Sequence, residues 1–288
     1  MTMRRLPIAL LAILFSTAVH AAPPAVVEAV QYPVWLERGG RTVPLTPGTT
    51  LQADDRLRTG DNARVQLKLA EGSTVKLGEK AKFVIERAED RGIFRATLNV
   101  LTGAFRFTTD ALKKTRQRDV SIKVKNVTAG VRGTDLWGKS GDDRDLVCLL
   151  EGKISVGAEG HPTVTLDNPL DFYQKPEGGK PEVSKVNQKQ IDLWAQETEI
   201  SRDGAAARAG GRWRVIAATF KQRDAGLALN RELRAAGYPA ELGSDNEGFF
   251  VQIRGLAGEA EARALMASLR GVKGVNSPLV TEMSGKRR

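Results

Sequence analysis

Histidine and cysteine are almost absent from this chain. Its 288 residues include two histidines, His20 and His161, and one cysteine, Cys148. A structural zinc site needs four Cys, His or acidic ligands, and a Cys–His dyad needs both residues in contact. The chain can build neither unless Cys148 and His161 meet, so we predict no metal and no cofactor. His161 precedes a proline in a glycine-containing turn, which favours a solvated loop residue.

The single cysteine also excludes an intramolecular disulfide. Cys148 lies in the apolar run Leu146–Leu150, which is typical of a buried strand. An apolar setting raises the pKa of a thiol and makes it inert. We therefore predict a small core residue, with a reactive thiol as the alternative.

Acidic residues form no recognisable catalytic or calcium-binding pattern. Asp142, Asp143 and Asp145 are interrupted by Arg144 and lack the spacing and distal Glu of a calcium loop. A glycan hydrolase would need two placed carboxylates, and no pair stands out by spacing. We predict no catalytic residues and a protein that is not an enzyme.

Long apolar runs are missing except at the N-terminus. Two arginines precede Leu6–Val19, and Val19 and Ala21 are the small residues that a signal peptidase reads. We predict a cleaved signal peptide over residues 1–21 and a periplasmic protein of a Gram-negative bacterium, with no transmembrane segment after cleavage. The alternative is a membrane anchor, but the run of 14 residues is shorter than the roughly 20 that a spanning helix needs.

The charge balance is basic. The formal net charge of +10 falls to +8 when Arg4 and Arg5 leave with the signal peptide. A basic surface favours an acidic partner. An exported chain meets anionic lipid and cell-wall polymer, so we expect no nucleic acid. The basic run at 113–118 lies between expected strands and is interpreted as a solvated loop.

Residues 22–170 show the period-two pattern of β-strands. Apolar and polar residues alternate in Val65–Leu69 and Thr74–Leu77 around a Glu-Gly turn, which predicts a hairpin. Further short strands are expected at 82–87, 94–101, 104–108, 120–125, 134–138, 146–150 and 153–156. Strands at this spacing predict an all-β sandwich or roll.

The texture changes after residue 170. Residues 171–211 are predicted to be a linker, because Lys175–Pro181 is rich in proline and glycine. A helix is expected at about 184–200, followed by a flexible stretch over 201–211.

Residues 212–283 alternate between strand and helix periods, and 284–288 form a basic tail. Strands are expected at 213–220, 238–242, 248–254 and 275–281, and helices at 224–236 and 259–270. This βαββαβ order predicts a small α+β domain, a four-stranded antiparallel sheet with two helices on one face.

The β-rich region resembles the FecR-like family. Four motifs occur in family order: Leu51–Gly60 (LQADDRLRTG), Leu69–Gly78 (LAEGSTVKLG), Leu101–Arg106 (LTGAFR) and Gly130–Asp135 (GVRGTD). We interpret them as structural, because their glycines supply turns, with a direct ligand role for Arg132 or Asp135 as the alternative. The resemblance implies a sensing or partner-recruiting domain.

The C-terminal region resembles the sporulation-related repeat (SPOR) family of peptidoglycan-binding domains. The resemblance rests on Trp213–Phe220 (WRVIAATF) and Phe249–Gly255 (FFVQIRG), and it departs from the family at Ile216, where the family has Gln, and at Phe250, where it has Arg. It implies that the helix-free sheet face binds glycan strands. Period two places these residues on that face: Arg214, Ile216, Phe250, Gln252 and Arg254.

Two functions fit these features. The first is an exported, non-catalytic protein that binds peptidoglycan glycan through residues 212–283, at sites of cell division as the SPOR resemblance implies, and that binds another envelope protein through the FecR-like region. The second is a periplasmic regulatory sensor whose C-terminal domain binds protein instead of glycan.

Overall fold

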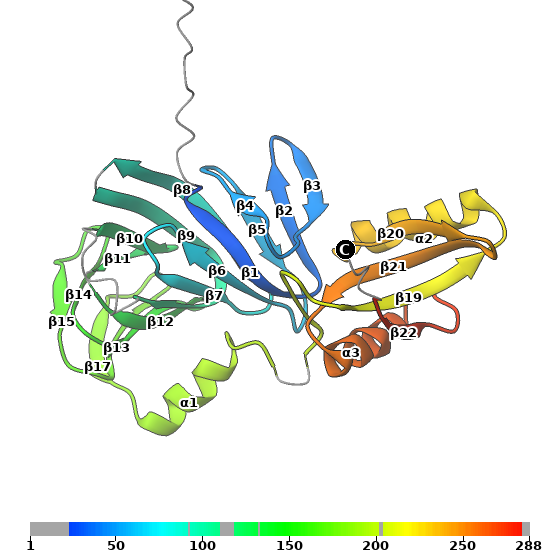
Figure 1. Ribbon diagram of the computed structural model, residues 1–288. Coiled ribbons are helices and arrows are strands. Elements are labelled where there is room, and N and C mark those ends of the chain that lie inside the picture. The colour runs from blue at the N-terminus through cyan, green and yellow to red at the C-terminus, as the bar shows by residue number, and fades with distance from the viewer. Residues whose placement is uncertain (1–22, 92, 110–117, 132, 202–203, 284–288) are drawn as a thin grey trace, which may run out of the picture.

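The computed structural model describes residues 23–91, 93–109, 118–131, 133–201 and 204–283. The expected signal peptide, residues 113–117 of the basic run and the basic tail lie outside these ranges. The chain is mostly β-sheet, with three helices in the described residues. A β-rich body, the β-domain (residues 23–185), lies beside a smaller C-terminal module (residues 212–283) (Figure 1).

The β-domain is built from strands that alternate buried and less buried side chains. They are, in chain order, β1 (Ala25–Gln31), β2 (Val34–Arg38), β3 (Arg41–Pro44), β4 (Thr50–Leu51), β5 (Arg56–Thr59), β6 (Arg64–Leu69), β7 (Thr74–Leu77), β8 (Lys82–Arg91), β9 (Ile93–Thr108), β10 (Arg118–Val124), β11 (Val127–Val131), β12 (Asp135–Ser140), β13 (Arg144–Glu151), β14 (Ile154–Ala158), β15 (Val164–Leu166), β16 (Asp171–Pro176) and β17 (Glu182–Lys185).

These strands form two sheets around a shared core. Sheet A has the order β17-β16-β13-β12-β9-β7-β6-β1-β4, and sheet B has the order β3-β2-β5-β8-β9-β10-β11-β14-β15. The pairings are antiparallel except between β9 and β10, which run parallel. The expected hairpin is confirmed as β6–β7, in which Leu67 lies opposite Val75.

Strand β9 belongs to both sheets, where the sequence predicted two separate strands. Its first part pairs with β8 and β10 in sheet B, and Gly103 to Thr108 pair with β12 in sheet A. The strand changes sheet at Gly103, whose φ of 89° favours glycine. A Cβ there would lie 2.6 Å from the Cα of Ala81. The two predicted strands are one, because glycine lets the strand bend without ending.

The β-domain extends past the predicted boundary at residue 170. Strand β16 pairs with β13, and β17 pairs with β16. The proline- and glycine-rich residues between them form the turn of this hairpin, in which Gly179 N–H donates to Pro176 O at 3.2 Å. The linker prediction for 171–185 is therefore wrong, because its composition marks a turn.

The rest of the chain holds the helices and five more strands. The elements are α1 (Gln188–Gln196), β18 (Ala206–Arg208), β19 (Trp213–Phe220), α2 (Arg223–Ala235), β20 (Glu241–Asp245), β21 (Gly248–Leu256), α3 (Glu259–Leu269) and β22 (Leu279–Glu282). Asn187 caps α1 by accepting from Gln190 N–H at 2.9 Å. Among the described residues, no helix has both the length and the apolarity that a membrane crossing requires.

Strand β18 joins the two bodies, where the sequence predicted a flexible stretch. Ala207 is fully buried and lies opposite Val30 of β1 on one side and Leu256 of β21 on the other. The side chains of Ala206 and Ala207 are small enough for this strand to fit between two others. That composition was interpreted as flexibility, and the interpretation is wrong for the described residues 204–208.

A second contact joins the module to the β-domain at Trp35. The indole Nε1–H donates to Ala235 O at 2.9 Å, and Val34 N–H donates to Gly237 O at 3.2 Å. Gly237 follows the end of α2 with a φ of 86°, a conformation that favours glycine after a helix. Because a Cβ at Gly237 would lie 2.7 Å from the Trp35 ring, glycine also allows this close approach.

Candidate functional site

The C-terminal module carries the predicted binding residues on its sheet. Its strands pair in the order β20-β21-β19-β22, all antiparallel. Helices α2 and α3 bury apolar side chains in the same core as Val215, Val251 and Ile253, which are fully buried. These three residues alternate along β19 and β21 with residues that were predicted to lie on the helix-free face.

The opposite side of the sheet brings the five predicted residues together. We call it the open face: Arg214, Ile216, Phe250, Gln252 and Arg254. Across β19 and β21, Arg214 lies opposite Arg254, and Ile216 lies opposite Gln252. Directly opposed residues share a face of the sheet.

Arg214 is the centre of a contact network on this face. Its Nη1 donates to Gln252 Oε1 at 2.9 Å, and its Nε donates to Thr281 Oγ1 at 2.9 Å. The guanidinium carbon lies 5.8 Å from the centre of the Phe250 ring, within the range of a cation–π contact. These contacts hold Arg214 across three strands and cover Gln252, which is 8% exposed.

Arg254 and Phe250 are held from β20. Arg254 is paired with Glu241, with Nε 2.6 Å from Oε2. Phe250 lies opposite Gly243, and a Cβ on Gly243 would lie 2.5 Å from the ring. The glycine thus leaves room for the ring to lie over the strand. The open face presents an aromatic surface beside fixed guanidinium groups, with the Gln252 amide mostly buried beneath them.

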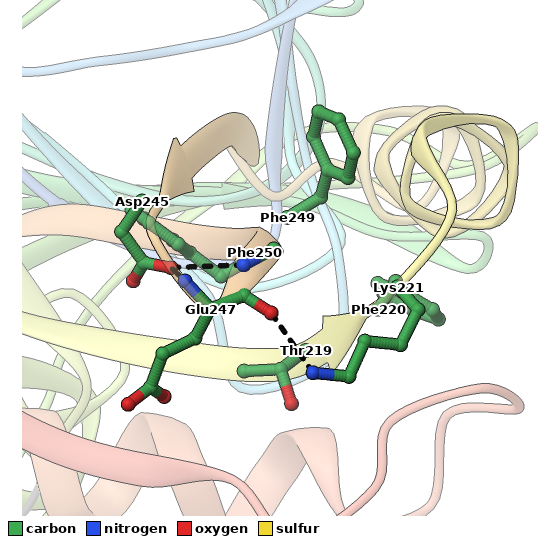
Figure 2. A pocket seen from close by; sticks show the side chains of 8 residues that line it. Thr219, Phe220, Lys221, Asp245, Glu247, Phe249 and Phe250 are labelled. Atoms are coloured by element: carbon green, nitrogen blue, oxygen red, sulfur yellow. Dashed lines mark hydrogen bonds between the residues drawn. The ribbon is translucent and has the colours of Figure 1, made fainter.

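A small pocket of about 150 Å³ lies at one end of this face, next to Phe250 (Figure 2). Asp245 accepts from Glu247 N–H at 2.9 Å and from Gly248 N–H at 3.1 Å, which closes the β20–β21 turn. Lys221 Nζ donates to Glu247 O at 3.1 Å. These bonds join the turn to the end of β19 and form the pocket.

The sequence patterns did not predict this pocket, and of its lining residues only Phe250 was predicted to bind a ligand. The sequence signal that could have indicated this pocket is the turn sequence Ser244–Gly248 (SDNEG). In such turns an Asp side chain accepts hydrogen bonds from backbone N–H groups two or three residues ahead. Its neighbour Phe250 was assigned to the open face. Because β20 begins at Glu241 instead of 238, the ends of the strands meet where the sequence did not place them.

The FecR-like motifs of the β-domain have structural roles, as predicted. Asp55 is 1% exposed and accepts from Arg38 Nε at 2.7 Å and from Gln52 N–H at 2.8 Å. Thr59 Oγ1 donates to Gly78 O and accepts from Ala81 N–H, both at 2.7 Å. These bonds connect the first motif to the second.

Asp135 also has a partner within the protein. Arg106 donates to both carboxylate oxygens, at 3.0 Å through Nε and 2.6 Å through Nη2. This hydrogen-bonded pair raises the pKa of Arg106 above its ordinary value. Asp135 is thereby committed to a structural ion pair, while Arg132 lies outside the described residues.

Cys148 is fully buried, as predicted. Burial, together with the charge of Asp171, raises the pKa of its thiol to about 12. Asp145, which belonged to the acidic run, is 2% exposed and accepts from Ser140 Oγ at 2.9 Å and from Asn126 N–H at 3.1 Å. Within the described ranges, no group of three or more His, Cys, Asp and Glu residues could hold a metal ion.

Comparison with known proteins identifies one region. Two crystal structures of a proposed anti-sigma factor from Parabacteroides distasonis are similar to this chain. The first is 14% identical to this chain, with a TM-score of 0.42. The aligned region covers 49% of this chain and 64% of the anti-sigma factor chain, which is less than two thirds of the length of the latter. The other is 13% identical with a TM-score of 0.42, and it covers 80% of this chain and 99% of that chain. No curated protein matches the chain.

The family comparison gives the clearer result. The matched region runs from just before β5 into β14 and contains three of the four motifs in full. It does not reach the C-terminal module, so the SPOR resemblance stays a prediction. Residues 55–155 match the family model described as FecR protein.

Proposed function

We propose that this protein is a non-catalytic component of the cell envelope with two binding parts. The open face binds peptidoglycan glycan, and the β-domain senses or recruits a partner protein. The match to the FecR family supports the regulatory part of the proposal. Export through the N-terminal signal would place the protein in the periplasm, where both ligands are available.

The observation that carries the glycan proposal is the composition of the open face. A sugar ring offers an apolar side to an aromatic ring, and its hydroxyl and acetamido groups pair with amide and guanidinium groups. Phe250 supplies the ring and Arg214 the guanidinium, and the mostly buried Gln252 amide holds Arg214 in place through its Oε1. Because Arg214 is held by Thr281 and Gln252, less side-chain entropy is lost when a ligand binds.

A second candidate, binding of a protein by the same face, is favoured by one observation. Leu279 of β22 is 55% exposed and lies opposite Ile216. Two aliphatic side chains beside an aromatic ring fit an apolar peptide better than a sugar. In addition, Arg254 is already neutralised by Glu241.

Co-sedimentation with purified sacculi separates the two candidates. Phe250→Ala should weaken binding if sugar rings stack on the ring, and Leu279→Ala should leave it unchanged. A wild-type protein that does not co-sediment with purified sacculi would favour a protein ligand. Full-length variants are required, because removal of residues 212–288 would also remove Gly237, which bonds Val34 of the β-domain, and β21, which pairs with β18.

A further inference from the structure

Strand β13 is apolar on both faces, and this is the first sign of a second binding surface. Val147 and Leu149 belong to the core between the sheets, whereas Leu146, Cys148 and Leu150 point to the outer side of sheet A. An outward apolar face must be covered. The apolar run Leu146–Leu150 is therefore continuous because both faces of β13 are buried.

The outer side of sheet A carries an apolar patch across three neighbouring strands. Trp137 of β12, Cys148 of β13 and Phe172 of β16 lie opposite one another in register. Trp137 is 1% exposed, but its Nε1–H has no hydrogen-bond acceptor within the described part of the chain. We call this surface the outer patch: Ala104, Trp137, Leu146, Cys148, Leu150 and Phe172.

One segment of the same chain covers the outer patch. We call it the strap (residues 186–200), and it contains α1, which lies outside the β-domain (Figure 1). Trp194 stacks on Trp137 with ring centres 4.6 Å apart and planes 5° apart, and it lies 5.4 Å from Phe172. Ile191 is buried in the same cluster.

Acidic residues at the end of the strap pair with a basic rim around the patch. Glu197 lies 2.8 Å from Lys139 Nζ. Glu199 lies 2.6 Å from Lys76 Nζ and 3.4 Å from Arg106 Nη1. The outer patch thus has an apolar centre and a cationic border.

The strap is held less firmly than the sheet beneath it. Its helix α1 spans only nine residues, a length that is marginal without tertiary contacts. Only Ile191 of the helix is buried, and Leu193 is 52% exposed. The ion pairs are partly exposed, and such pairs contribute little stability. Local opening of the strap is therefore easier than unfolding of the domain.

From these observations we infer that the outer patch is a docking surface for an amphipathic helix of a partner protein, and that the strap is its built-in competitor. The strap indicates the partner's chemistry: an aliphatic and an aromatic anchor three residues apart, followed by carboxylates. Helices that insert such anchors into a groove are a common recognition mode. A partner that also offers an acceptor to Trp137 Nε1–H would satisfy a donor that the strap leaves unpaired.

The strap precedes β18, the strand that joins the two bodies, in the chain. Ser201 N–H, at its end, donates to Gln31 Oε1 at 3.2 Å. Displacement of the strap would therefore pull on the junction with the C-terminal module. The inference rests on the proposed partner-binding role of the β-domain. Its tests use no glycan, so their failure leaves the wall-binding proposal standing.

Cys148 is a native probe of the strap, because it is the only cysteine and lies in the patch. In the full-length protein, Trp194→Ala should increase the rate of Cys148 labelling by a thiol reagent by roughly tenfold, since opening becomes easier. The control Leu193→Ala should label at the wild-type rate. Labelling at low denaturant should depend little on denaturant, as local opening predicts.

A peptide of residues 186–200 then tests the docking surface. Added to the Trp194→Ala protein, it should bind and slow Cys148 labelling, and the same peptide with Glu197→Gln and Glu199→Gln should protect less. The inference is overturned if Cys148 labels only with the denaturant dependence of global unfolding. It is equally overturned if the peptide gives no protection.

Discussion

Cys148 is buried without any polar function, which makes it a sensitive reporter of packing. Its sulfur lies 3.8 Å from the nearest acceptor, Leu149 O. A serine hydroxyl at this distance would have no hydrogen bond. The residue therefore contributes as a small apolar side chain.

Replacement of Cys148 by serine should lower stability without changing wall binding. A buried hydroxyl without a partner costs about 1–3 kcal/mol, which denaturant-induced unfolding would measure. Co-sedimentation with sacculi should be unchanged at a temperature where both proteins are folded. Loss of wall binding at unchanged stability would show that the thiol has a role in the ligand site.

Glu86 gives the stability a defined dependence on pH. It accepts from Lys123 Nζ at 2.7 Å and from Asn99 Nδ2 at 2.6 Å. The bond from Lys123 lowers the pKa of Glu86 below its ordinary value of 4.5. A lowered folded pKa contributes stability that is complete above the unfolded value and is lost as pH falls through the folded value.

Glu86→Gln should therefore lower stability at pH 7 and reduce the loss of stability in acid. The effect is small, about 0.2–1 kcal/mol, because both partners are partly exposed. Urea unfolding at pH 7 and at pH 3 would measure it. Glu159→Gln, at an exposed position, is the matched control. Equal acid dependence in wild type and Glu86→Gln would contradict the assignment.

At the residue scale, the sequence could predict faces but not partners. The alternation in β19 and β21 placed Arg214 and Gln252 together, because strand geometry fixes which side chains share a face. The pairing of Arg254 with Glu241 could not be predicted. It depends on the register of β20, which begins three residues later than the pattern indicated.

At the scale of elements, β18 is the strand that connects the β-domain to the C-terminal module. It lies between β1 and β21, so its backbone has ladder partners on both sides. The two bodies also meet where Tyr238 approaches Tyr32, with ring centres 6.4 Å apart. The residues in these contacts are far apart in sequence, so no local sequence pattern predicts that they meet.

Proline at Ala207 should separate the two bodies while each keeps its secondary structure. A proline inside a strand removes a ladder hydrogen bond and introduces a steric clash. Small-angle scattering should show a larger radius of gyration, with an unchanged circular dichroism spectrum. Ala209→Pro is the control, because Ala209 is exposed in the turn in which Gly211 N–H donates to Arg208 O. Identical scattering from Ala207→Pro and wild type would show that β18 does not hold the bodies together.

The element-scale errors have a common physical cause. Gly103, the turn at 177–181 and the alanines at 205–207 were interpreted from local composition as a break, a linker and a flexible stretch. In the structure each is fixed by a segment that is distant in sequence. Gly103 packs against Ala81, and the turn at 177–181 follows β16, which pairs with β13. The alanines of β18 lie between β1 and β21. The hairpin β6–β7 was predictable because both of its strands and its turn are adjacent in sequence.

At the scale of the whole molecule, wall binding requires export. Mature protein from envelope fractions should begin at Ala22, because the small residues at 19 and 21 position signal peptidase. Mass spectrometry of the N-terminal peptide would identify the first residue. Recovery of Met1 in the same fractions would contradict cleavage.

Wall binding by the open face is the central claim, and the salt dependence of co-sedimentation with sacculi that contain peptide-free stretches of glycan tests it most directly. Such glycan carries little charge, so Arg214 and Arg254 would act mainly as hydrogen-bond donors. A rise from about 0.1 M to about 1 M salt, which shortens the Debye length from about 10 Å to about 3 Å, should weaken wild-type binding only moderately. Phe250→Ala should weaken it strongly at both concentrations, with the fold intact. Binding that disappears at high salt but survives Phe250→Ala would show that general basic charge, and not the open face, holds the protein on the wall.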